Sequence, residues 1–188
     1  MNGLDETSET LILGIGNLLW ADEGFGVRCV EALDADFCFG DETLLMDGGT
    51  QGMFLLPWVS NTEKLLIFDA IDFGLPPGEL RVIEDDDVPR YMGAKKISMH
   101  QTGFQEVLAA ARLLNDRPRR LALVGVQPER LDDYGGGLRE SVRRRIPDAI
   151  GAACGVLRSW KVPFHARSSS RVDKEPTSLE PVGVAGNG

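Results

Sequence analysis

Four continuous apolar runs constrain the fold of this chain more than any other feature of its sequence. Each run is short and ends at a turn or polar residue, which is typical of a buried strand. The runs cover residues 11–16, 44–47, 65–69 and 121–126. Because they do not alternate between apolar and polar residues, they predict central strands of a parallel sheet that is covered by helices on both faces.

Amphipathic helical patterns alternate with these runs. The clearest has apolar residues spaced by three and four, which places them on one side of a helix: Phe104, Val107, Leu108, Ala111 and Leu114. Residues 102–105 (TGFQ) form a capping box in front of it, so His100 is predicted to lie just outside the helix. Another helix is expected after Asp22, and a last one from about 147 to 160.

Together these elements predict an α/β fold of the doubly wound class. It is an open, mostly parallel twisted sheet of about five strands with helices on both faces. Residues 80–84 partly alternate and predict an edge strand. We expect an N-terminal extension over 1–9, a single domain over 10–165 and a disordered tail over 166–188, because the tail is polar and has no hydrophobic period.

Composition excludes several functional classes. The net charge of −9 opposes binding to nucleic acid, whose partners use clustered Lys and Arg. No apolar run approaches the roughly 18 residues needed to cross a bilayer, and the acidic N-terminus lacks the pattern of a secretory signal. The three cysteines have no C-x-x-C spacing. A cytoplasmic protein without membrane insertion is the expectation.

A glycine-rich loop follows the first apolar run. It reads GIGNLLWADEGFG over 14–26, at the place where a dinucleotide-binding fold carries its phosphate-binding glycines. The third glycine of that fingerprint is replaced by Leu19, and there is no P-loop G-K-[S/T] sequence. Asp47, at the end of the second run, imitates a ribose-binding acid, so nucleotide binding stays an alternative.

Several ionisable residues follow the predicted strands. Glu23 lies in the loop after the first strand, Asp47 ends the second and Asp69 ends the third. In an open α/β sheet, ligands gather beyond these carboxyl ends, and carboxylates and imidazole bind divalent metals. Taken one at a time, Glu23 also fits an ordinary acid in the first turn of a helix capped by Asp22, and His100 a packed or capping group.

The usual peptidase machinery is absent. The sequence has no H-E-x-x-H helix and no G-x-S-x-G elbow, and the D-G-G-T at 47–50 has no second copy to form an aspartic dyad. Cys29 and Cys154 fall in apolar helical patterns and Cys38 beside a turn, so all three are expected to be structural.

Four motifs in order along the chain resemble those of the hydrogenase maturation endopeptidase family, most closely the members that serve uptake-type nickel–iron hydrogenases. They are GIGNLLWADEGFGVR at 14–28, DGGTQG at 47–52, FDA at 68–70 and MHQTG at 99–103. The strand-like LVGVQP at 123–128 also resembles the last strand of that family. The resemblance covers about residues 10–160.

The resemblance implies a function and a site. Glu23, Asp69 and His100 match the family's nickel ligands, and Glu23 or Asp69 is the candidate base. It implies that nickel arrives with the precursor of the hydrogenase large subunit, whose C-terminal extension the enzyme removes. The attacking nucleophile, the cleavage position and the oligomeric state stay open. A noncatalytic nickel- or nucleotide-binding carrier of the same fold is the alternative.

Overall fold

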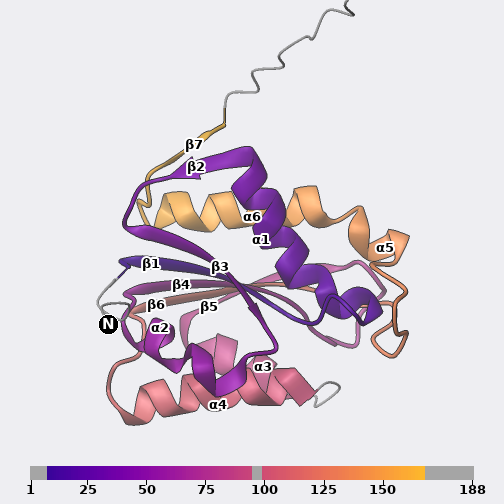
Figure 1. Ribbon diagram of the computed structural model, residues 1–188, viewed down its shortest axis with the longest axis horizontal. Coiled ribbons are helices and arrows are strands. Elements are labelled where there is room, and N and C mark those ends of the chain that lie inside the picture. The colour runs from indigo at the N-terminus through magenta and orange to yellow at the C-terminus, as the bar shows by residue number, and fades with distance from the viewer. Residues whose placement is uncertain (1–7, 95–98, 168–188) are drawn as a thin grey trace, which may run out of the picture.

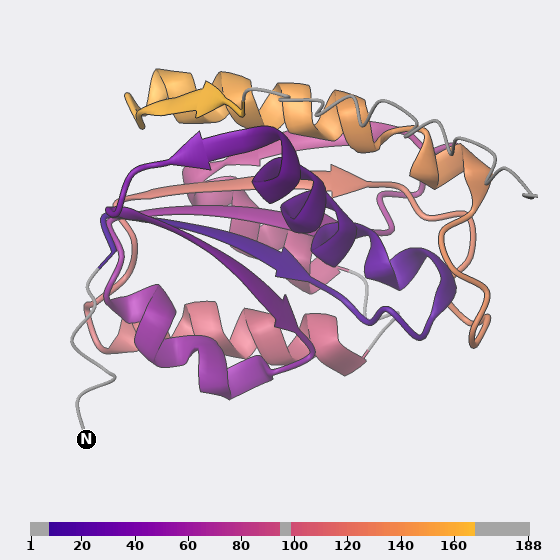
Figure 2. The same cartoon turned by 45° about the horizontal axis from the view of Figure 1, so that its top comes forward.

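The computed structural model describes residues 8–94 and 99–167, with side chains for all of these except 93–94 and 99–103. One five-stranded sheet lies between two layers of helices, with α1 and α6 on one face and α2, α3 and α4 on the other (Figures 1 and 2). The predicted fold class is confirmed. Among the helices of the described residues, none is long and apolar enough to cross a membrane.

The sheet has the strand order β3-β1-β4-β6-β5. Its strands are β1 (Thr10–Ile15), β3 (Thr43–Gly49), β4 (Lys64–Ala70), β5 (Leu80–Glu84) and β6 (Arg120–Val126). The helices are α1 (Phe25–Asp36), α2 (Leu56–Ser60), α3 (Val88–Ala94), α4 (Met99–Leu113), α5 (Glu140–Arg143) and α6 (Ile146–Ser159). Short 3-10 helices are η1 (Ala21–Gly24), η2 (Gly52–Leu55) and η3 (Asp85–Asp87).

The four apolar runs are the parallel strands β1, β3, β4 and β6, as predicted. The segment that partly alternates is β5, which pairs antiparallel with β6 at the edge of the sheet. Side chains of the central strands alternate between two apolar cores. Ile12, Leu66 and Phe68 pack toward α1 and α6, whereas Leu13 and Ile67 pack toward α4. Burial on both faces explains why these strands have no polar residues in alternation.

The start of α4 differs from the prediction. The helix begins at Met99, so the T-G-F-Q sequence lies inside it and Thr102 is not its N-cap. His100 is therefore the second residue of α4 and does not precede the helix. A capping-box pattern is a local signal, and the chain here is helical for three residues before it.

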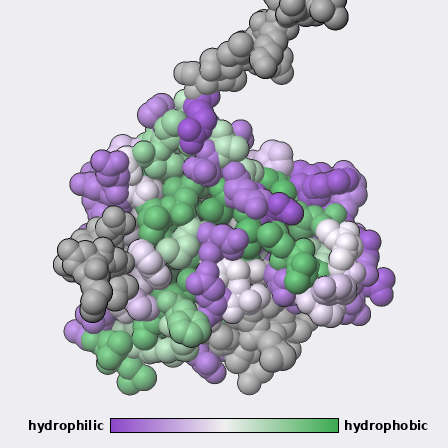
Figure 3. All heavy atoms as spheres, viewed as in Figure 1, coloured by the Kyte–Doolittle hydropathy of each residue, from purple (hydrophilic) through white to green (hydrophobic). Residues whose placement is uncertain are grey.

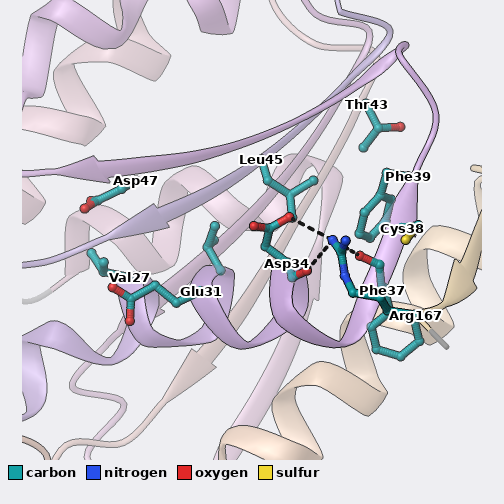
Figure 4. Close-up of a pocket in the computed structure, with 11 residues that line it drawn as sticks. Val27, Glu31, Asp34, Phe37, Cys38, Phe39, Thr43, Leu45, Asp47 and Arg167 are labelled. Atoms are coloured by element: carbon teal, nitrogen blue, oxygen red, sulfur yellow. Dashed lines mark hydrogen bonds and ion pairs between the residues drawn. The ribbon is translucent and has the colours of Figure 1, made fainter. Parts of the chain in front are cut away.

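The first two residues of the predicted tail are part of the fold. Ala166 ends β7 (Phe164–Ala166), which pairs antiparallel with β2 (Phe37–Phe39). The guanidinium of Arg167 donates to the carbonyl oxygens of Asp34 at 2.8 Å and Phe37 at 3.2 Å, beside a hollow along α1 (Figure 4). The remainder of the predicted tail, 168–188, lies outside the described residues.

Close backbone packing places the start of α1 against two strands. A Cβ added at Gly26 would lie 2.2 Å from the carbonyl oxygen of Phe68 in β4 and 2.3 Å from that of Ile15 in β1. A Cβ at Gly14 would lie 2.5 Å from the carbonyl oxygen of Gly26. Only glycine permits these approaches, so the two glycines fix how near the helix comes to the carboxyl ends of β1 and β4.

We expect the substitution Gly26→Ala to lower the free energy of unfolding by about 2 kcal/mol or more, because the methyl group meets backbone atoms that cannot rotate away. Gly155→Ala is the matched control, since Gly155 also lies in a helix but has open space around it. That change should raise stability by up to about 1 kcal/mol through helix propensity. Urea denaturation measures both, and equal effects of the two substitutions would contradict the packing argument.

Candidate active site

The candidate site lies at the topological switch point of the sheet. The chain leaves β1 toward β3 on one side, then crosses to β4 on the other side, so the connections diverge beyond the carboxyl ends of β1 and β4. Open α/β sheets bind ligands in the crevice at such a point. Glu23, in η1 after β1, and Asp69, near the end of β4, both lie there.

A tight turn brings η1 back over the end of β1. Gly16 has φ +132°, a conformation that side-chain-bearing residues rarely adopt. A Cβ at this position would lie 1.7 Å from the carbonyl oxygen of Glu23. The N–H of Gly16 also donates to the carbonyl oxygen of Gly49 at the end of β3, at 3.0 Å. The glycine therefore sets the position of the Glu23 backbone above the sheet.

Glu23 is almost completely buried, with 8% of its surface exposed. Burial raises the pKa of its carboxyl group from the ordinary value of 4.5 to about 7, because the charged form is poorly solvated. At neutral pH the group is then present in both protonation states. A carboxyl with this pKa can accept and return a proton during a reaction.

Asp69 is fully buried beside it. One carboxylate oxygen accepts a hydrogen bond from the N–H of Ala70 at 2.7 Å, and the other, Oδ2, has no hydrogen-bonding partner in the part of the chain that the structure describes. Burial raises the pKa of Asp69 well above its ordinary value, and the negative charge of Glu23 raises it further, although the Ala70 hydrogen bond opposes the shift. Two neighbouring buried carboxyls do not both ionise readily unless a cation lies between them, and without one they tend to keep a proton.

This arrangement fits a metal ion on the chemistry of its donors. Oδ2 of Asp69 is a buried acceptor without a hydrogen-bonding partner among the described side chains, and Glu23 supplies a second carboxylate from the neighbouring loop. Among the residues whose side chains are described, no three His, Cys, Asp or Glu side chains gather as a metal site. The third predicted ligand, His100, has its backbone in the first turn of α4, and its side chain lies outside the described part of the structure.

Asp22 has a different role from the predicted helix cap. The N-cap of α1 is Gly24, and the buried Asp22 carboxylate instead accepts three backbone hydrogen bonds from a distant loop. The donors are the N–H groups of Glu129 at 2.9 Å, Arg130 at 2.8 Å and Arg139 at 2.7 Å. This carboxylate therefore ties the loop that follows β6 to the loop that carries Glu23.

Gln127, directly after β6, joins two loops at the same edge of the sheet, and the sequence argument gave it no role. Its side-chain oxygen accepts from the N–H groups of Phe73 at 2.8 Å and Leu75 at 3.1 Å, and its Nε2 donates to Asp72 Oδ1 at 3.1 Å. These bonds join the loop after β4 to the end of β6. The available signal was a polar residue directly after a buried strand, which is the same signal that pointed to Asp69.

The other candidate residues lie elsewhere. Asp47 is exposed at the end of β3 and lines the hollow along α1 shown in Figure 4. Cys29 and Cys154 are buried in the core, where burial raises the pKa of both thiols and disfavours the reactive thiolate. Cys38, expected beside a turn, pairs with His165 in the small β2–β7 sheet.

The raised pKa of Glu23 predicts how stability depends on pH. The proton on this group stabilises the folded chain fully below about pH 4.5, the ordinary pKa, and that contribution is lost as pH rises through about 7. Glu23→Gln has no proton to lose there. We therefore expect the free energy of unfolding of the parent, relative to Glu23→Gln, to fall between these two pH values. Urea titrations across that range measure it, and parallel curves would contradict the assignment.

Comparisons with known proteins show the family to which this chain is related. The sequence profile of the hydrogenase maturation protease family matches residues 27–156. The hydrogenase expression/formation protein HupD of Thiocapsa roseopersicina is 54% identical over 165 residues, which cover 88% of this chain and 75% of that protein. The hydrogenase 2 maturation protease of Escherichia coli (strain K12) is 41% identical over 149 residues, which cover 79% of this chain and 90% of that protein.

Among solved structures, the hydrogenase maturating endopeptidase HybD from E. coli is similar with a TM-score of 0.81 and 40% identity, over 86% of this chain and 99% of that chain. The match by sequence and the match by fold each cover more than four fifths of this chain. The chain belongs to the hydrogenase maturation protease family and is a peptidase.

Proposed function

We propose that this chain is an endopeptidase that removes the C-terminal extension of the nickel-loaded large-subunit precursor of a nickel–iron hydrogenase, in the cytoplasm. The observation that carries the proposal is the buried acid pair, Glu23 and Asp69, at the switch point of the sheet. Membership of the maturation protease family favours this role over the noncatalytic carrier.

The acid pair is suited to recognise a metal that the substrate brings. Two carboxylates and the imidazole of His100, if its side chain completes the set, are oxygen and nitrogen donors that suit a borderline divalent ion such as nickel. The buried Asp69 Oδ2 gains a positive partner when such a substrate binds. Contacts of this kind need to supply only about 1.4 kcal/mol to favour a nickel-loaded precursor tenfold over a nickel-free one.

Glu23 is the better candidate for the proton transfers of peptide hydrolysis. Its pKa of about 7 gives a sizeable ionised fraction at neutral pH, whereas Asp69 is fully buried and carries the additional repulsion of Glu23. As a water molecule attacks the scissile carbonyl carbon, Glu23 accepts its proton. It then returns the proton to the amide nitrogen as the carbon–nitrogen bond breaks, so the free acid and the free amine are the products.

The site predicts the effect of removing each donor. Glu23→Gln should lower the rate of precursor processing by about 100-fold or more, because loss of a positioned acid–base group typically costs this much. Asp69→Asn and His100→Ala should also lower it strongly, because each removes a donor to the metal of the substrate. Glu31→Gln is the matched control, since Glu31 is an exposed glutamate on α1 that pairs with Arg28. Mass spectrometry of the precursor after timed incubation measures the rate.

Unchanged rates in all three variants would refute the assignment of these residues. A slow control would indicate that any change of carboxylate charge in this region impairs the enzyme. Thermal melting of each variant separates loss of activity from loss of fold.

A further inference from the structure

Four large apolar side chains are exposed beside the acid pair. They come from two loops that follow different strands, and their exposed fractions are Leu18 39%, Leu19 55%, Trp20 36% and Tyr134 68%. Figure 3 shows hydrophobic atoms at the surface over the segment that joins β1 to α1. Contiguous exposed apolar groups of this kind are typical of interaction sites. We call these four residues the apolar rim.

The two loops of the apolar rim are joined to each other. Trp20 and Tyr134 form an antiparallel backbone bridge, and their rings pack edge to face with centroids 5.4 Å apart. The N–H of Gly135 donates to the carbonyl oxygen of Leu19 at 2.7 Å, and the N–H of Ala21 donates to that of Asp133 at 3.0 Å. Because the backbones are already ordered, a partner that binds here pays little entropy for arranging them.

Asp22 supports the apolar rim from the interior. Its three hydrogen bonds with the loop after β6 hold that loop against η1, which directly follows Trp20. Burying a carboxylate costs solvation free energy. We therefore infer that the position of the loop that it holds is important. The rings of Trp20 and Tyr134 therefore lie on loops whose backbones are held in place by hydrogen bonds.

The charged residues around the rim neutralise one another. Arg130 pairs with Asp132 at 3.0 Å, and Arg139 pairs with Asp133. The rim therefore offers little net charge to attract an acidic or a basic partner. An uncharged apolar segment is the complementary occupant.

The apolar rim is continuous with the acid pair. The N–H of Glu23 donates to the carbonyl oxygen of Trp20 at 2.9 Å, so the rim and the candidate base belong to one short segment. A polypeptide whose scissile bond reaches Glu23 must pass close to these side chains. The neighbouring part of the substrate is thus the natural occupant of the rim.

We propose that Leu18, Leu19, Trp20 and Tyr134 bind an uncharged apolar segment of the precursor polypeptide next to the scissile bond. This inference rests on the proposed function for the identity of the substrate. The rim supplies affinity and sets which stretch of the chain lies over the acid pair, while the chemistry stays with Glu23 and Asp69.

The test immobilises the nickel-loaded large-subunit precursor through its N-terminus and measures binding of the full chain by biolayer interferometry. We expect the double variant Leu19→Ser/Tyr134→Ser to raise the dissociation constant at least tenfold. Tyr134→Phe, which keeps the ring, should bind as the parent does. Leu113→Ser is the matched control, because Leu113 is 87% exposed at the end of α4, away from the carboxyl ends of β1 and β4.

If the double variant does not fold, the dissociation constant of Tyr134→Ser alone is the test, because this side chain is mostly exposed. A dissociation constant within twofold of the parent, or no binding by the parent, overturns the inference. A parent dimer that the same substitutions convert to monomer also overturns it, because the rim then binds a second copy of the chain.

The mass of the immobilised subunit is read after each run. A parent that binds through the rim but leaves this mass unchanged refutes the proposed function and not the docking surface.

Discussion

The close approach of α1 to the carboxyl ends of β1 and β4 is the constraint on which the site depends. Gly26 lies where a methyl group would meet the carbonyl oxygens of both strands, and Gly16 turns the chain tightly enough to place Glu23 over the sheet. With bulkier residues the helix would move outward, and Glu23 would move toward solvent. Asp69 would then lose the neighbour whose charge helps to raise its pKa.

Burial gives Glu23 of the acid pair a pKa suited to proton transfer, but it also costs solvation free energy. A carboxyl kept out of water favours its protonated form, which gives Glu23 a pKa of about 7. One oxygen of Asp69 has no hydrogen-bonding partner among the residues whose side chains are described. The rest of the fold stabilises this arrangement through two apolar cores and through the Asp22 and Gln127 hydrogen bonds that join the surrounding loops. A cation brought by the substrate would relieve the repulsion, so specificity and proton transfer have the same physical origin.

Features with a local signal could be predicted from the sequence. Unbroken apolar runs gave the central strands, partial alternation gave the edge strand, and polar residues at strand ends pointed to Glu23 and Asp69, which the fold brings together. Contacts between residues that are far apart in the chain have no such local signal in the sequence. Asp22 bonds to residues more than a hundred positions away, and Ala166 pairs with Phe37 across the fold.

The central claim is that the acid pair recognises a metal carried by the substrate. Enzyme stripped with a chelator, and then freed of it, is offered nickel-loaded and nickel-free precursor side by side, and the mass of each precursor is followed with time. If a metal carried by the substrate adds contacts to Glu23 and Asp69, the loaded form is processed at least tenfold faster. Equal and rapid cutting of the nickel-free form by the stripped enzyme would contradict the account.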